Sequence, residues 1–345
     1  MMKNEKTDVT PADPDFAFEP VLSAKDCLYS CKSALNDEYT RQKSAFLPRD
    51  PFFWREQWRQ LKLAHCAVPG YGNARQFWGN KKMIDAVYMK GRKKHGMADG
   101  TRAAALGVPD GSRILDIGTG PGTYAVPLAA RGCRVTVVEP SPIMREALAE
   151  NMREQGARDI KVIPKRWEDI TVQELGGPFD VVIASYSLTM MDIGTALAKM
   201  QACCTGTIHL FWFLTPPTWV QVNKDLWPLL HGGEFPGEPM ADWLWQVLCE
   251  MGIYANLQVE MKFPPSVYAS VDNAVSEFSG RLKCSTAAHE ETARNYFQSV
   301  LRQEDEGYVL GGETLGAHIW WTRGLPKERA KETQPAGSRK HRNTG

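Results

Sequence analysis

The stretch Leu115-Asp116-Ile117-Gly118-Thr119-Gly120-Pro121-Gly122-Thr123 decides the fold. It joins a short apolar run that begins at Arg113 to a segment with a helical pattern over 123–131. An apolar run that ends in glycines is typical of a buried parallel strand, and the glycines let the backbone turn tightly and approach a ligand closely. The stretch therefore predicts a strand, a ligand-binding turn and a helix, in that order.

The same pattern recurs along the chain. Four further apolar runs predict strands, at 133–139, 159–163, 179–185 and 207–214. Helices are predicted between them at 141–155, where Ser141 suits the N-cap and Pro142 the first turn, and at 194–203. Strands and helices that alternate at this spacing predict an α/β fold with an open, doubly wound sheet.

The last third of the chain is less regular. It predicts a helix at 240–251, a strand at 255–263, helices over 271–304 with a break near Lys283, and a strand at 316–322. A chain that ends with a strand, a long insertion and a strand could close its sheet with an antiparallel edge.

Domain boundaries follow from these changes of pattern. We expect disorder over 1–20 and 324–345, which have few apolar residues to bury. A helical N-terminal lid is predicted over 21–105, and the main domain over 106–323 with a helical insertion, or cap, at 264–312.

Composition narrows the class of protein. The 345 residues contain 41 basic and 40 acidic side chains, a net charge of +1, which argues against a dedicated nucleic-acid binder. No apolar run is long enough to span a bilayer, and the first twenty residues lack the apolar core of a secretory signal. The 8 cysteines form no C-x-x-C pair and suit reduced thiols, so we expect a cytoplasmic protein.

Two acids give the glycine-rich turn its chemistry. Asp116 precedes the glycines, where a carboxylate would repel a pyrophosphate but attract an ammonium group. No G-x-x-x-x-G-K-[ST] sequence is present, so a nucleoside triphosphate is a poor fit. Glu139 ends the second predicted strand, where a carboxylate can accept hydrogen bonds from both hydroxyls of a ribose.

The run LDIGTGPGTYAVPLAARGCRVTVVEPSPIM, at 115–144, resembles the first two motifs of the class I S-adenosylmethionine-dependent methyltransferases. The resemblance covers roughly 105–215 well and the remainder loosely. It implies a Rossmann-like, mostly parallel, seven-stranded sheet, S-adenosyl-L-methionine as the cofactor and methyl transfer as the activity.

The resemblance also implies positions for the cofactor. The three glycines of the turn would pack against its methionine part with Asp116 nearby, and Glu139 would hold the ribose. The segment 166–169 (RWED) would hold the adenine. Many members carry an acid where this chain has Arg166, and here either Glu168 or Asp169 would take its place. The cofactor-binding residues predicted in this way are Asp116, Gly118, Thr119, Gly120, Gly122, Glu139, Pro140, Trp167, Glu168 and Ser185. Trp167 has a second interpretation, in which its side chain packs in the core.

The acceptor should bind beyond the carboxyl ends of the strands. We predict an acceptor site of aromatic residues from the lid, the fourth strand end and the stretch 215–236, namely Trp78, Tyr88, Tyr186, Trp219 and Trp227. The stretch 215–236 is rich in aromatic, Pro and Gly residues and looks too irregular for a plain helix. His231 is the candidate base with Glu234 as its partner, and the alternative for His231 and for both tryptophans is a packing role.

These observations predict methyl transfer to a small-molecule acceptor, with no membrane and no nucleic acid as a partner. The Asn/Asp-Pro-Pro-Tyr pattern that marks methylation of amino groups in nucleic acids is absent after the fourth strand. Three alternatives stay open: an RNA or protein methyltransferase, a nucleotide-dependent oxidoreductase, and a non-catalytic scaffold that keeps the cofactor. No metal is expected, because the pairs His65-Cys66 and Cys203-Cys204 lack the spacing of a zinc site.

Overall fold

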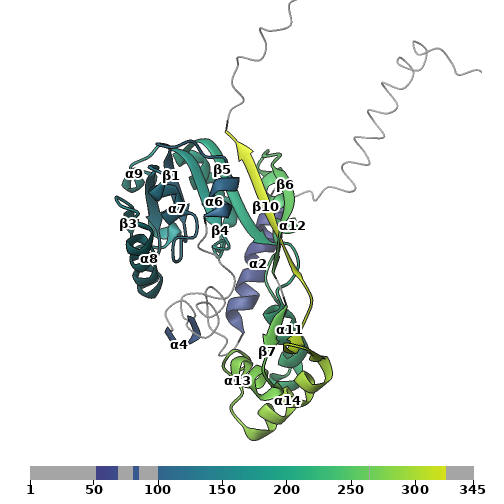
Figure 1. Cartoon of the computed structure of the whole chain (residues 1–345). Coiled ribbons are helices and arrows are strands. Elements are labelled where there is room, and N and C mark those ends of the chain that lie inside the picture. The colour runs from purple at the N-terminus through teal and green to yellow at the C-terminus, as the bar shows by residue number, and fades with distance from the viewer. Residues whose placement is uncertain (1–51, 69–80, 85–99, 264, 324–345) are drawn as a thin grey trace, which may run out of the picture. The chain divides into compact units, whose positions relative to one another are not determined.

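The computed structural model describes residues 52–68, 81–84, 100–263 and 265–323 (Figure 1). The chain divides by its contacts into two units, Met1–Phe53 and Trp54–Gly345, and the account below concerns the second. The predicted disordered ends, at 1–20 and 324–345, lie outside the described residues.

A seven-stranded sheet forms the centre of the second unit. Its strands, in spatial order, are β3 (Lys161–Ile163), β2 (Arg134–Val138), β1 (Arg113–Ile117), β4 (Phe179–Ser185), β5 (Cys204–Phe213), β10 (Thr314–Thr322) and β6 (Asn256–Phe263). The first five are parallel, and β10 is antiparallel to both of its neighbours. The predicted Rossmann-like, mostly parallel fold is confirmed.

The last two strands of the sheet close it as expected. β10 lies between β5 and β6 and pairs antiparallel with both, so the sheet has an antiparallel edge, and its outermost strand is β6. Burial agrees with this order: most of β10 is buried, whereas Leu257 and Val259 of β6 are 40% and 48% exposed. Two apolar strands separated by an insertion do not reveal from their sequence which of them is outermost.

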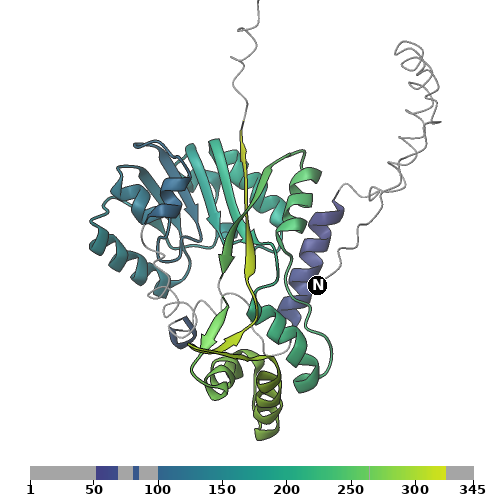
Figure 2. The ribbon, with the colours of Figure 1, turned by 45° about the vertical axis from the view of Figure 1, so that its right-hand side comes forward.

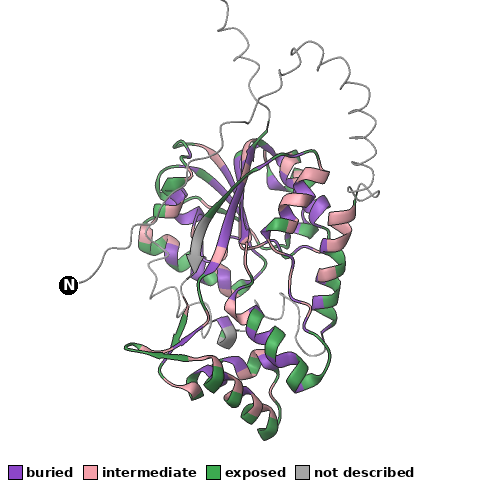
Figure 3. Cartoon of the chain, turned by 90° about the vertical axis from the view of Figure 1, so that its right-hand side faces the viewer, coloured by how far each residue is buried: buried purple, intermediate pink, exposed green. Residues whose placement is uncertain are grey.

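Helices cover both faces of the sheet (Figure 2). Alternate strand residues enter two separate apolar clusters, as Ile114 and Leu115 of β1 illustrate. One cluster packs under α6 (Thr101–Ala105), α7 (Ala125–Ala130) and α8 (Pro142–Gln155). The other packs under α2 (Phe53–Ala67), α9 (Val172–Leu175), α10 (Ile193–Cys203) and α12 (Ala241–Glu250). The central strands are thus buried along most of their length (Figure 3).

The start of α8 confirms the expected helix cap. The Ser141 hydroxyl accepts a hydrogen bond from the Met144 amide at 3.3 Å, and Pro142 occupies the first turn. Gly156 ends the helix with φ +66°, in the left-handed region that glycine adopts readily. These local signals determine where the chain passes from strand β2 to helix α8, directly after Glu139.

The stretch 215–236 is mostly helical, so the predicted irregular loop is wrong. The helix α11 runs from Thr218 to His231 with Pro228 inside it. Proline removes one backbone hydrogen bond, and here this occurs in the last turn, where the helix is about to end. The buried residues Val222, Leu226 and Leu230, four positions apart, pack in a third apolar cluster and stabilise the helix.

That third cluster joins α11 to the inserted segment. The insertion contains β7 (Ser266–Tyr268), α13 (Val271–Leu282), α14 (Ala287–Val300), β8 (Arg302–Glu304) and β9 (Gly307–Leu310). Its two helices were expected, and Lys283, with φ +54°, makes the break between them. The three strands, which form a small antiparallel sheet, were not expected, because three or four residues are too few to show a period.

The helix α2 is anchored to the second sheet face. Trp58 is fully buried and its indole N–H donates to the Met190 carbonyl at 3.0 Å. The carboxylate of Glu250 accepts hydrogen bonds from the Trp54 and Arg55 amides at 2.6 and 3.2 Å, and so satisfies the free N–H groups of the first turn. The remainder of the predicted lid that is described consists of α4 (Lys81–Ile84) and α6. Within the described residues, no helix is long and apolar enough to span a membrane.

Candidate functional site

The predicted site residues gather at one edge of the sheet. Ile117, at the end of β1, is paired with Val138 of β2 and with Ala184 of β4. The carboxyl ends of these parallel strands therefore lie side by side. They carry the acids that flank the glycine-rich turn and also Ser185, which is half-buried and paired with Phe211 of β5.

Asp116 is almost completely buried, at 2% exposure. Burial raises its pKa to about 7. Hydrogen bonds, of which that from Thr119 has the largest effect, lower the pKa and so oppose this shift in part. The Thr119 hydroxyl donates to the carboxyl group at 2.6 Å. A cation close to a buried acid favours its carboxylate form, and the ammonium group of a ligand would be such a cation.

Sterics explain two of the glycines in the turn. Gly118 has φ +67°, and a Cβ there would lie 2.4 Å from Cβ of Ser187. Gly122 has φ +88°, and a Cβ there would lie within 2.6 Å of side-chain atoms of Val126 and Leu148. No other residue type fits at either position without displacing these side chains, so the packing of the turn against its neighbours requires glycine at both.

Glu139 connects the turn to the second strand. Its two carboxylate oxygens accept hydrogen bonds from the amides of Gly120 and Ser141, both at 2.8 Å. Burial raises the pKa of this carboxyl group, whereas the two amides and Arg145 lower it. The Arg145 guanidinium also donates to the carbonyls of Glu139 and Pro140, at 2.9 and 2.8 Å. The orientation of the acid is therefore fixed by the chain itself.

The segment after β3 forms a 3-10 turn at Trp167–Asp169. The Trp167 side chain is 3% exposed and its indole N–H donates to the Ala196 carbonyl at 3.2 Å, so the core-packing interpretation describes the side chain. Asp169 is bound to the Arg166 guanidinium at 2.7 and 2.8 Å. Glu168, the other acid of this turn, is exposed, and no ion pair joins it to Arg166 in the described structure.

Tyr186 marks the end of β4. It has φ +52°, which is uncommon for a residue with a side chain, and its amide donates to the Phe211 carbonyl at 3.0 Å. Its ring lies 4.8 Å from the ring of Phe213, at the end of β5. The next residue, Ser187, donates its hydroxyl to the Ile117 carbonyl at 2.6 Å. The aromatic pair is thus connected to the glycine-rich turn through one residue.

The candidate base and its partner are not brought together. His231, at the end of α11, bonds through Nε2 to the Leu282 carbonyl at 2.7 Å, so Nε2 is the donor. Its ring packs against Trp227 and His289 at 4.4 and 5.2 Å. No hydrogen bond joins His231 to the exposed Glu234 within the described part of the chain. These contacts are those of the packing role that the sequence left open.

The predicted acceptor residues separate into three groups. Trp227 is 3% exposed and packs with Val68 and Phe235, and Trp219 packs in the third cluster beneath the Arg281 guanidinium, 5.4 Å from its ring. Both show the contacts of the packing alternative. The predicted Trp78 and Tyr88 lie outside the described residues. Tyr186 is the predicted acceptor residue that the structure places next to the glycine-rich turn.

The sequence analysis missed two residues that contact the glycine-rich turn and stabilise it. Ser187 closes over Gly118, and Asn151 of α8, which is buried, donates to the Pro121 carbonyl of the turn at 2.6 Å. A buried asparagine on the apolar face of the predicted 141–155 helix was the available signal for the second of these.

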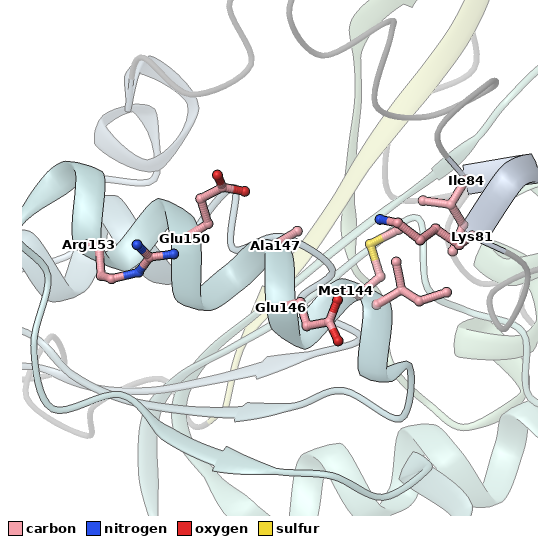
Figure 4. A pocket seen from close by; sticks show the side chains of 8 residues that line it. Lys81, Ile84, Met144, Glu146, Ala147, Glu150 and Arg153 are labelled. Carbon is pink, nitrogen blue, oxygen red and sulfur yellow. The ribbon is translucent and has the colours of Figure 1, made fainter.

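A separate pocket of about 250 Å³ lies between α4 and α8 (Figure 4). The side chains lining it are Lys81, Ile84, Ile143, Met144, Glu146, Ala147, Glu150 and Arg153. None of them belongs to the predicted site.

Comparison with known proteins identifies a domain in this chain. Residues 114–205 match the family model described as a methyltransferase domain. The chain carries a class I S-adenosylmethionine-dependent methyltransferase domain. The protein is therefore a methyltransferase enzyme, and its cofactor is S-adenosylmethionine.

Several proteins are similar to this methyltransferase. An uncharacterised protein of Haemophilus influenzae is 29% identical over 226 residues, which are 63% of this chain and 78% of that protein. A ribosomal RNA small subunit methyltransferase G of Mycolicibacterium smegmatis is 42% identical over 84 residues, but these are 23% of this chain and 35% of that one. A crystal structure of magnesium protoporphyrin IX methyltransferase from Synechocystis PCC 6803 with bound SAH is 14% identical with a TM-score of 0.43, over 74% of this chain and 99% of that one.

The described residues fit the cofactor of the family. The turn requires glycine at 118 and 122, Asp116 is buried with a pKa of about 7, and the Glu139 carboxylate is oriented at the neighbouring strand end. These are, in order, a tight glycine turn at the sheet edge, a partner for an ammonium group and an acceptor for ribose hydroxyls.

Proposed function

We propose that this methyltransferase acts on a small molecule with an apolar or planar part. The observation that carries the proposal is the pair of Tyr186 and Phe213, whose rings lie 4.8 Å apart at the ends of β4 and β5. Aromatic side chains offer a large apolar surface, and pockets for small ligands are lined mainly by such groups. The net charge of +1 supports a small acceptor over a nucleic acid.

The cofactor is held, in this proposal, by the predicted edge residues. Asp116 and Thr119 lie at the amino end of the methionine part, Gly118, Gly120 and Gly122 pass beneath it, and Glu139 accepts from the ribose. Pro140, Ser185 and the backbone of Trp167 lie around the nucleoside, and Glu168 accepts from the adenine amino group. S-adenosylmethionine supplies an electrophilic methyl group on a sulfonium, so the protein's own contribution is to hold the acceptor in line with it.

The strain at Tyr186 supports a functional role for that residue. A left-handed backbone at a tyrosine costs about 1–2 kcal/mol and persists only where neighbouring structure imposes it. Here the Phe211 carbonyl holds its amide, and the turn at Ser187 follows directly. This backbone directs the tyrosine ring to Phe213 at the carboxyl edge of the sheet.

The inserted cap and α11 share a core of their own. The helices α11, α13 and α14 share one apolar cluster, which includes Leu226, Phe278 and Phe297. His231 fastens the end of α11 to the end of α13 through the Leu282 carbonyl. We therefore assign His231 and Trp219 to the contact of α11 with this cap and Trp227 to the packing of α11 with Val68 and Phe235, and assign no general base. Methyl transfer does not always require a base, because positioning alone can contribute much of the rate.

The test is a transfer assay with methyl-labelled S-adenosylmethionine. The purified enzyme is offered three fractions of an extract from its own organism: small molecules, RNA and protein. The proposal predicts label in the small-molecule fraction, and label in RNA or protein alone would contradict it. Cofactor binding without label in any fraction would indicate a non-catalytic scaffold.

The variant Tyr186→Ala connects this assay to the site. Loss of the ring should lower transfer by ~10–100-fold, because a small misplacement of the acceptor is that costly, while the affinity for S-adenosylhomocysteine stays near the wild-type value. The matched control is Tyr254→Ala, which removes a ring that is 82% exposed and should leave transfer unchanged.

A further inference from the structure

The ammonium group of Lys199, on α10, lies within the turn proposed above to hold the adenine. Its Nζ donates to the carbonyl of Trp167 at 2.5 Å, to that of Ile170 at 2.7 Å and to that of Glu168 at 3.5 Å. An ammonium group has three N–H donors, and two carbonyls of the turn and that of the next residue, Ile170, receive them. The same Nζ lies 4.7 Å from the centre of the Trp167 ring, within the range of a cation–π interaction.

These contacts add to the few hydrogen bonds that the short turn makes for itself. The 3-10 turn spans three residues, Trp167–Asp169, and its Trp167 carbonyl also accepts from the Ile170 amide, at 3.4 Å. A lysine side chain at the end of a helix can bond such carbonyls. Hydrogen bonds to a charged donor are roughly twice as strong as those between neutral groups, so Lys199 is a strong restraint on the turn.

A second contact fixes the same turn to the same helix. The Trp167 indole N–H donates to the carbonyl of Ala196, one turn of α10 before Lys199. Burial lowers the pKa of Lys199, while the charges of Glu168 and Asp169 raise it. Two residues of α10 therefore hydrogen-bond to the turn, and the ion pair of Arg166 with Asp169 joins its two ends.

We infer that Lys199 is a positioning residue for adenine recognition, which holds the 166–169 turn in its binding shape before the cofactor arrives. The inference rests on the proposed placement of the adenine at this turn. Lys199 would act without touching the nucleotide: it fixes the backbone from which Glu168 and the Trp167 amide face the base. A pre-formed site binds more tightly because the turn loses no further conformational entropy when the ligand binds.

The test compares two ligands on three proteins. The ligands are S-adenosylhomocysteine and its deaminated analogue, in which hypoxanthine replaces adenine and a carbonyl stands in place of the amino group. The proteins are the wild type, Lys199→Met and the control Lys161→Met. Lys161 also donates to two backbone carbonyls, those of Glu174 and Leu175 at 3.3 and 3.2 Å, but these end the following helix α9 and not the turn.

The wild type and Lys161→Met should prefer S-adenosylhomocysteine by ~10–100-fold, because the analogue leaves an acceptor of the turn unpaired. In Lys199→Met the preference should fall to a few-fold, mostly through weaker binding of the adenine ligand. If Lys199 had only a structural role, Lys199→Met would bind both ligands more weakly by the same factor, and the ratio of their affinities would stay as in the wild type. That result would overturn the inference. Should Lys199→Met fail to fold, Lys199→Gln, which keeps two donors, carries the same test with a smaller expected fall.

Hydrogen exchange of the ligand-free protein supplies an independent readout. The amides of Asp169 and Ile170, which bond to the carbonyls of Arg166 and Trp167, should exchange at least several-fold faster in Lys199→Met than in Lys161→Met. Equal rates in the two variants would overturn the inference. Failure of the wild type to bind S-adenosylhomocysteine would instead refute the proposed cofactor placement, and with it the role of Lys199.

Discussion

The carboxylate of Glu139 accepts a hydrogen bond from the amide of Gly120 at 2.8 Å, so the acid that ends β2 is joined directly to the turn that follows β1. Its other oxygen accepts from the Ser141 amide at the same distance. Each carboxylate oxygen keeps a further lone pair, and these remain available to the two hydroxyls of a ribose. The link explains how two strands present one cofactor site: the turn and the acid are oriented by each other before a ligand binds.

Replacement of Gly118 by alanine should remove cofactor binding. The new Cβ would meet Ser187 at 2.4 Å in a left-handed backbone, so the turn or the end of β4 must shift. We expect an affinity for S-adenosylhomocysteine lowered by at least ~100-fold, measured by calorimetry, because the site depends on close backbone approach.

The control for this variant is Gly132→Ala. Gly132 also has a positive φ, +90°, but its Cβ would have no neighbour within 4 Å. It should reduce the free energy of unfolding by ~1–2 kcal/mol through backbone strain alone and leave binding intact. Equal binding by Gly118→Ala and Gly132→Ala would show that the close contact with Ser187 has no role in the site.

Cofactor affinity should rise with pH up to about pH 7, where Asp116 titrates. The raised pKa means that the carboxyl group is largely protonated below that pH, whereas an ammonium ligand favours the carboxylate. Binding should therefore release a proton between about pH 5 and 7, and calorimetry in buffers of different ionisation enthalpy measures that release.

The variant Asp116→Asn tests this assignment. It should bind more weakly at neutral pH and lose the pH dependence, while Asp110→Asn, an exposed acid of the same region, should retain it. A wild-type affinity that is flat over this range would contradict a titrating partner for the ammonium group.

The buried pair of His209 and His318 predicts a loss of stability in mild acid. Nδ1 of the first ring lies 2.9 Å from Nε2 of the second, and burial lowers the pKa of His209 to about 4. The unfolded state takes up protons below about pH 6.5 whereas the folded state does not, so this contribution to stability is complete above pH 6.5 and lost as the pH falls toward 4. The loss should reach ~3 kcal/mol in urea unfolding experiments at a series of pH values.

Replacement of His209 by phenylalanine should flatten that dependence, because phenylalanine does not titrate and its ring replaces the one that stacks on His318 at 5.1 Å. The half-buried His289 is the control, and His289→Phe should keep the wild-type slope. The comparison with wild type isolates the pair from Asp116, whose raised pKa changes stability in the opposite direction as the pH falls. An unchanged slope in His209→Phe would contradict the assignment.

The sequence predicted the part of the fold that local patterns determine. The strand, glycine turn and helix at 113–131 and the Ser141 cap have signals within a few residues, and each was found close to its expected bounds. The helix α11 was missed because Pro228 and the aromatic residues looked like breakers, whereas its stability comes from contacts with α13 and α14, far along the chain. Which of β6 and β10 is outermost could not be predicted, for the same reason.

The site shows the same division. Asp116 and Glu139 could be selected because the ends of neighbouring strands carry them. His231 was selected by residue type and by its place in an apparent loop, but its partner, Leu282, is 51 residues away and could not be seen in the sequence. Lys199 was missed because an interior helix lysine has no motif, and its three carbonyl partners belong to another element.

The central claim is that Glu139 and the glycine turn form an S-adenosylmethionine site. The most direct measurement is calorimetric titration with S-adenosylmethionine and S-adenosylhomocysteine, beside NAD and with Glu139→Ala as the paired variant. The account predicts micromolar binding of the first two ligands, no binding of NAD, and a loss of affinity of ~100-fold or more in the variant. Binding of NAD alone, or equal binding by wild type and Glu139→Ala, would contradict it.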